Sequence, residues 1–228
     1  MSAPKDLRDA VERDLRATRP LRPPSVRALV LIPLAVAIVL AVPGLHFFRS
    51  DMSAIGFVKA WGFSFGQALA GLVIIASALR ESVPGRGLSR GVMAATIAVG
   101  LAIPAALLVL TAPTFDIGPG PGRALQEGVA CFRVSAIAAV PALVAAAILA
   151  ARAFPLRPAL AGALYGLGCG LIADAGLRLY CEYSVPQHVL LAHGGAILGA
   201  MAVGSVVAKI AARRSQGRHP RVRSIPRS

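Results

Sequence analysis

The chain has 228 residues, of which 56% are hydrophobic, and its mean hydropathy of +0.70 is too high for an ordinary soluble domain. Several uncharged runs reach or approach the roughly 20 residues that a helix needs to cross a bilayer. A net charge of +14 would suggest a nucleic-acid partner in a soluble protein. In this apolar chain we interpret it as a topology signal, and we expect contact with the lipid bilayer and no direct contact with nucleic acid.

Two further signals narrow the class. Three cysteines without a CxxC pair argue against a zinc ribbon or a thioredoxin motif. A polar segment of about 26 residues precedes the first apolar run, and no small-residue cleavage site follows that run, so the pattern does not indicate a signal peptide.

The segment 1–26 is polar and carries charges of both signs. Leu7, Val11 and Leu15 are four residues apart and would share one face of a helix, which prolines after residue 19 would end. Two interpretations stay open: a short amphipathic helix that docks a cytoplasmic partner, or a solvated tail that orients the first span. We treat 1–26 as a cytoplasmic segment, 27–208 as the transmembrane domain and 209–228 as a basic cytoplasmic tail.

The apolar pattern predicts an all-α, polytopic membrane protein with six transmembrane helices. The first helix is expected to kink near Pro43. The predicted spans are 27–48, 55–79, 91–110, 134–151, 158–179 and 188–208.

Charge distribution predicts the orientation of these spans. Six spans put both termini on one side, and 19 of the 24 Lys and Arg residues fall on that side. Positively charged loops are retained in the cytoplasm, so we expect both termini there. The same assignment places Cys131 and Cys181 at the outer surface, with Cys131 just before span four and Cys181 just after span five.

Cys131 and Cys181 are the main candidate site residues. At the outer ends of different helices they are compatible with a disulfide, because the outer compartment is oxidising, or with a soft transition-metal ion such as copper, zinc or cadmium. His188 and His193 are near enough in sequence to join them as accessory ligands. The alternatives are a purely structural pair of cysteines and interfacial histidines that cap a turn. We expect no obligatory cofactor.

Asp174, Arg178 and Glu182 are spaced by four residues, which would place them on one face of span five. Asp174 lies within the membrane, where an ionisable residue is costly and usually paired, and Arg178 is its expected partner. The triplet would either position Cys181 or form a local ion pair. Glycines at 162, 166 and 170 predict a close helix contact. The sequence contains no catalytic motif that we recognise, so we expect a protein that is not an enzyme.

Several short motifs follow one another along the chain: RPLRPPSVR at 19–27, ESVPGR at 81–86, Cys131, FPLRPALAGAL at 154–164, the stretch 174–181 and SVPQHVLLAHGG at 184–195. In this order they resemble the NrsF-type membrane anti-sigma factors, which are negative regulators of an extracytoplasmic-function sigma factor in proteobacteria.

The resemblance implies a multi-pass protein of the bacterial inner membrane that holds a sigma factor inactive and releases it under stress, including heavy-metal stress. It also implies that Cys131 and Cys181 are the outward sensing pair. Leu7, Val11 and Leu15 are assigned loosely to sigma-factor binding. A small transporter or channel and a membrane thiol oxidoreductase are the alternatives. The first would need polar groups near the membrane midplane, and the second a reactive pair close in sequence.

Overall fold

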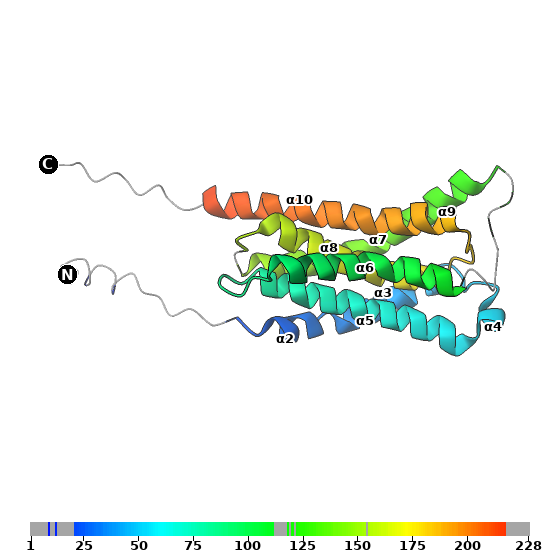
Figure 1. Ribbon diagram of the computed structural model, residues 1–228, viewed down its shortest axis with the longest axis horizontal. Coiled ribbons are helices and arrows are strands. Elements are labelled where there is room, and N and C mark those ends of the chain that lie inside the picture. Colours follow the sequence, from blue (N-terminus) through cyan, green and yellow to red (C-terminus); the bar gives the residue numbers. More distant parts are fainter. Residues whose placement is uncertain are drawn as a thin grey trace.

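The computed structural model describes residues 9, 12, 21–111, 118, 120, 122–153 and 155–217. The described chain is helical, and its long helices lie side by side in one bundle (Figure 1). Its elements are α2 (Pro24–Leu29), α3 (Ile32–Leu45), α4 (Met52–Ile55), α5 (Phe57–Glu81), α6 (Arg90–Thr111), α7 (Ala124–Ala151), α8 (Pro158–Leu177), α9 (Pro186–His188), the π-helix η1 (Val189–Gly194) and α10 (Gly195–Gly217).

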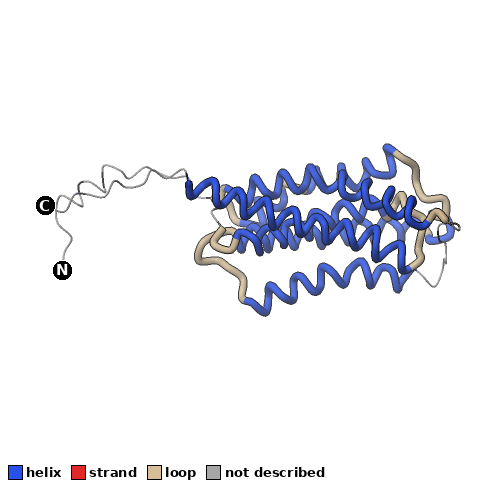
Figure 2. The backbone as a smooth tube through the Cα atoms, turned by 90° about the horizontal axis from the view of Figure 1, so that it is seen from above, coloured by secondary structure: helices blue, strands red, loops and turns tan. Residues whose placement is uncertain are grey.

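Six helical segments of the described chain are long and apolar enough to cross a membrane, which confirms the predicted number of spans. Their bounds are Pro24–Leu45, Phe57–Glu81, Arg90–Leu110, Ala124–Ala151, Pro158–Leu177 and Pro186–Ser215. The connecting loops gather at the two ends of the bundle (Figure 2). These features describe a multi-pass membrane protein.

The first span is interrupted, but not at Pro43 as the sequence predicted. Pro43 lies inside the continuous helix α3, whereas the break falls at Val30 and Leu31, just before Pro33. Because Pro33 has no backbone N–H, it cannot donate the helical hydrogen bond to the carbonyl of Leu29. Helix α2 accordingly ends at Leu29.

Helix α8 is the centre of the bundle. In its most apolar stretch 89% of the residues are buried, against 22–44% for the other five spans. It contacts α3, α5, α7 and α10. A helix surrounded in this way by protein can transmit a change at one end to several neighbours at once.

Glycines allow this crowding around α8. A Cβ added at Gly162 or Gly166 would lie 2.3 Å from a backbone oxygen of α10, so the predicted close contact of this glycine row is confirmed. On another face of α8, a Cβ at Gly168 would lie 2.4 Å from the carbonyl oxygen of Gly71 in α5. The partner helices therefore pack backbone against backbone on both faces.

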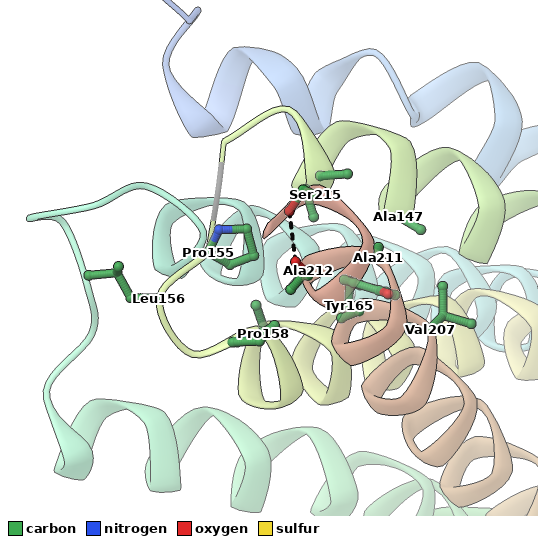
Figure 3. Close-up of a pocket in the computed structure, with 13 residues that line it drawn as sticks. Ala147, Pro155, Leu156, Pro158, Tyr165, Val207, Ala211, Ala212 and Ser215 are labelled. Carbon is green, nitrogen blue, oxygen red and sulfur yellow. Dashed lines mark hydrogen bonds between the residues drawn. The ribbon is translucent and has the colours of Figure 1, made fainter. Parts of the chain in front are cut away.

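The described chain starts and finishes at the same end of the bundle (Figure 1). At this end Glu81 and Arg157 form an ion pair, with Nε and Oε1 2.6 Å apart. An apolar cavity of about 320 Å³ lies beside it between α7, α8 and α10, and Pro155, Leu156 and Tyr165 are among its lining residues (Figure 3).

Some sequence predictions fall outside the described residues. They concern Leu7, Val11 and Leu15, most of the cytoplasmic segment 1–26, and the part of the basic tail beyond residue 217. The docking role of the segment stays a prediction.

Candidate metal centre

Two cysteine thiols meet at the end of the bundle opposite Glu81 and Arg157. Cys131 lies about two turns inside α7, and Cys181 lies four residues beyond the end of α8. Their Sγ atoms are 3.5 Å apart, and both residues are free cysteines. They are only 4% and 6% exposed, so the pair is buried within this end of the bundle. The predicted position of the pair on the outer side of the membrane stays a prediction.

The position of Cys131 differs from the prediction because α7 is longer than expected. The helix begins at Ala124 rather than at residue 134, and Cys131 is therefore a helical residue and not part of the preceding loop. The turn at Gly122, where φ is +78°, marks the point at which the chain enters the helix.

The segment that carries Cys181 is fixed by the loop after α3. Arg49 donates hydrogen bonds to the carbonyl oxygens of Arg178 and Glu182, at 3.2 and 3.5 Å. Its guanidinium is itself held by Asp51, with Nε and Oδ1 2.5 Å apart. Cys181 thus lies on a short non-helical stretch whose backbone is held by a neighbouring loop.

The spacing by four predicted that Glu182 shares one face of span five with Asp174 and Arg178, and this prediction is wrong. Helix α8 ends at Leu177, so Glu182 belongs to the stretch beyond it. Its carboxylate accepts a hydrogen bond from the hydroxyl of Ser50. Glu182 therefore ties two loops together.

His188 joins the thiol pair. Its Nε2 atom is 3.4 Å from Sγ of Cys181, and the residue is buried at the end of α9. The donor atoms of Cys131, Cys181 and His188 all lie within 4.8 Å of one another. The structure thus brings one of the two candidate accessory histidines directly against the cysteines.

His193 lies next to this group but has a different partner. Its Nδ1 atom is 2.7 Å from Oδ1 of Asp174, which is fully buried in α8. Arg178 is also paired with Asp174, at 3.2 Å between Nε and Oδ2, as the sequence predicted. Gln67 of α5 donates a third contact, at 2.7 Å to the same Oδ2 atom.

Sequence reasoning missed Gln67 and the pairing of Asp174 with His193. An amide in the middle of an apolar span is costly unless it is hydrogen-bonded, so the position of Gln67 in the sequence could have predicted a buried polar partner. The pairing of Asp174 with His193 required knowing that α8 and η1 are neighbours, which no local pattern reveals. Together these contacts form a buried polar cluster of Asp174, His193, Arg178 and Gln67.

Two cavities border the group. A small one of about 40 Å³ is lined by Cys181, His193 and Ser64, among others. A larger apolar one of about 570 Å³ is lined by His188 and by residues of α7 and the α9–η1 segment. The small cavity therefore adjoins Cys181, and the larger one adjoins His188.

The hydrogen bond with Cys131 and burial both raise the pKa of the Cys181 thiol above its usual value, although contacts with His188 and His193 partly oppose this. Cys181 is therefore a protonated thiol at neutral pH rather than an activated thiolate. A metal ion that binds there has to displace the proton.

Two of the three donor–donor separations are close to those that a soft metal ion requires. Metal–sulfur bonds of ~2.3 Å and metal–nitrogen bonds of ~2.0–2.1 Å in a tetrahedron place two sulfurs about 3.8 Å apart, and a sulfur and a nitrogen about 3.5 Å apart. The observed separations are 3.5 Å for the two sulfurs and 3.4 Å for Cys181 Sγ and His188 Nε2. A thiolate and imidazole donor set favours zinc, cadmium or copper over magnesium or calcium.

A bundle with six candidate membrane spans and a buried thiol and imidazole group near one end defines a multi-pass membrane protein with a candidate metal centre. The chain belongs to the NrsF family, described as negative regulator of sigma F, whose model matches residues 12–213. This is a family of membrane anti-sigma regulators and not of enzymes. Neither the curated proteins nor the solved structures include a significant match to the chain.

Proposed function

We propose that this protein sequesters an extracytoplasmic-function sigma factor at the cytoplasmic face of the bacterial inner membrane, and that metal or oxidative stress at Cys131 and Cys181 releases it. The observation that carries the sensing part is the 3.5 Å contact between the two thiols. Cys131 belongs to α7 and Cys181 to the stretch that follows α8, and these two helices pack on one another. Either a disulfide or a shared metal ion would therefore join α7 to the exit of α8.

The orientation rests on charge. In the six-span topology derived from the sequence, 19 of the 24 Lys and Arg residues fall on the side that holds both termini, so that side faces the cytoplasm and the thiols face outward. The cytoplasmic end then binds the sigma factor and forms the output surface, and the opposite end holds the thiols that receive the signal.

The output surface comprises the segment 1–26 together with the loops at 80–90 and 152–157. The ion pair of Glu81 with Arg157 supports a single surface, because it joins these two loops directly. Leu156 contributes an exposed apolar side chain beside the cavity at this end. A sigma factor bound there is kept from core RNA polymerase.

A signal at the thiols reaches this surface through α8, which runs from the sensory end to Arg157. A ligand shifts such an equilibrium only if it binds one packing of the bundle more tightly than the other. Moving the population from mostly bound to mostly released requires roughly 5 kcal/mol of difference in binding free energy, which is within the range of structural thiolate–metal binding. No cofactor is obligatory in this scheme, since the metal ion is the signal.

The test is co-purification of the detergent-solubilised full chain with the sigma factor, together with a reporter of that sigma factor's regulon. We expect association in unstressed cells, loss of association after exposure to cadmium or an oxidant, and a derepressed reporter when the gene is deleted. A reporter that does not respond to the deletion would rule out the anti-sigma function.

A further inference from the structure

Two histidines that are five residues apart lie on the same side of their segment because that segment is a π-helix. In an α-helix, with 3.6 residues per turn, His188 and His193 would point about 140° apart around the axis. His193 lies in η1 and His188 is the residue just before it, and the i→i+5 hydrogen bonds of a π-helix bring residues five apart close to one face. The two imidazole rings are 5.6 Å apart between centroids. Such π-turns occur frequently at functional sites.

His193 has the arrangement of a metal ligand with its supporting carboxylate. A ligating histidine usually donates its other ring N–H to a carboxylate, which fixes the ring and its tautomer. Nδ1 of His193 is bound to Asp174, which leaves Nε2 as the free donor atom.

That Nε2 atom is buried, and the ring lies beside the Cys181 thiol. His193 is 2% exposed, and its Nε2 makes no hydrogen bond of ordinary geometry among the described residues. The ring interacts electrostatically with the Cys181 thiol and borders the small cavity of about 40 Å³ that Cys181 also lines. A buried imidazole nitrogen without a well-aligned hydrogen bond costs free energy unless something binds it.

We propose that Cys131, Cys181, His188 and His193 form a closed, tetrahedral S₂N₂ site for one divalent zinc-like or cadmium-like ion, with Asp174 as the positioning residue of His193. The proposal rests on the sensing function above and specifies the ion and its ligands. His193 lies outside the tighter Cys131–Cys181–His188 group, so metal binding draws its Nε2 toward the sulfurs.

This movement suggests how occupancy alters the bundle. His193 belongs to the π-helical start of span six, while Asp174 belongs to α8 and bonds Gln67 of α5. An ion held by four side chains joins α7, the exit of α8 and η1 at one point. A disulfide between the cysteines would leave η1 free, so the two signals predict different changes in span six.

The experiment is a titration of the reduced full chain in nanodiscs with Co²⁺ as a spectroscopic probe and with Cd²⁺. We expect one Co²⁺ per chain, thiolate-to-cobalt charge transfer and the absorption of four-coordinate cobalt. His188→Ala and His193→Ala should each weaken binding by more than the 10- to 100-fold that is typical of losing a supporting residue. His46→Ala is the matched control, because His46 is an exposed histidine at the same end of the bundle.

Asp174→Asn should weaken binding by about 10-fold or more while the cobalt spectrum stays four-coordinate with two sulfurs. A purely structural role for Asp174 would lower stability without changing the metal affinity of the folded fraction. Circular dichroism and size-exclusion chromatography identify variants that do not fold. For those, X-ray absorption of the wild-type cadmium complex counts sulfur and nitrogen ligands directly.

Affinity and spectrum unchanged by His193→Ala, or a wild-type complex with fewer than two nitrogen ligands, would overturn the proposal. Wild-type protein that binds neither metal would do so as well. None of these measurements involves a sigma factor. A chain that binds cadmium through two sulfurs and two nitrogens but does not release a sigma factor would keep this site and refute the sensing function.

Discussion

Glu81 and Arg157 join the two loops on the side of the bundle where the described chain begins and ends. Arg157 precedes the first residue of α8, and Glu81 is the last residue of α5. The Glu81 carboxylate also accepts a hydrogen bond of 2.7 Å from the backbone N–H of Leu88. Its side chain is 2% exposed, whereas that of Arg157 is 39% exposed. One carboxylate therefore fixes both the loop that follows α5 and the start of α8.

Arg157→Ala should destabilise the protein by about 1–2 kcal/mol, between the values for exposed and buried ion pairs, because Glu81 stays buried without its cation. The midpoint of unfolding in SDS or on heating measures the change. Arg152→Ala, an exposed arginine in the same loop, is the control and should change stability by less than about 0.5 kcal/mol. Equal changes in stability for the two substitutions would show that the ion pair of Glu81 with Arg157 does not stabilise the protein.

Gly71 and Gly62, both in α5, should respond in opposite ways to alanine. A Cβ at Gly71 would lie 2.6 Å from the carbonyl oxygen of Gly168, so Gly71→Ala forces α5 and α8 apart and should cost about 1–3 kcal/mol. A Cβ at Gly62 meets nothing within 4 Å, so Gly62→Ala should be neutral or stabilising by up to about 1 kcal/mol. Unfolding midpoints of the two variants decide this, and a harmless Gly71→Ala would contradict the close packing.

The glycine rows of α8 and α5 show which helix contacts could be predicted from the sequence and which could not. Spacing by four correctly predicted that glycines of α8 pack against a neighbour, since α8 is surrounded by protein. Gly62 and Gly66 of α5 are also four residues apart, yet a Cβ at either meets nothing within 4 Å, because that face of α5 is exposed. A spacing defines a helix face, but it does not indicate which face meets another helix.

The candidate site shows the same division. Hydropathy and charge placed Cys131 and Cys181 at one end of the bundle, because long apolar runs and basic loops are strong signals. The π-helix has no comparable signal: a helix with i→i+5 bonds is a local departure set by tertiary contacts. His188 and His193 were therefore identified as candidates from proximity in sequence, while their shared face and the partner of His193 emerged only from the fold.

Cys131→Ser and Cys181→Ser should each abolish induction of the sigma-factor regulon by cadmium, because either substitution removes a thiolate from the proposed site. A promoter reporter measures the induction. Cys169→Ala is the control, since Cys169 is a fully buried residue inside α8 and takes no part in the thiol pair. Induction that persists in both serine variants would make the pair structural, and a shared loss in all three variants would indicate misfolding.

Metal affinity should rise with pH. The hydrogen bond with Cys131 and burial raise the pKa of Cys181 above its usual value, so the thiol is protonated at neutral pH and an incoming ion has to displace that proton. Below the thiol pKa, each displaced proton makes the dissociation constant for Cd²⁺ fall about tenfold per pH unit, and the dependence ends above that pKa. Competition titrations across this range measure the slope, and calorimetry in buffers of different ionisation enthalpy counts the protons released.

In Cys181→Ser the number of protons released per bound Cd²⁺ should fall by one, because serine has no comparable thiol to titrate. A slope that is the same in wild type and variant would show that Cys181 is not deprotonated on binding, and hence that it is not a ligand.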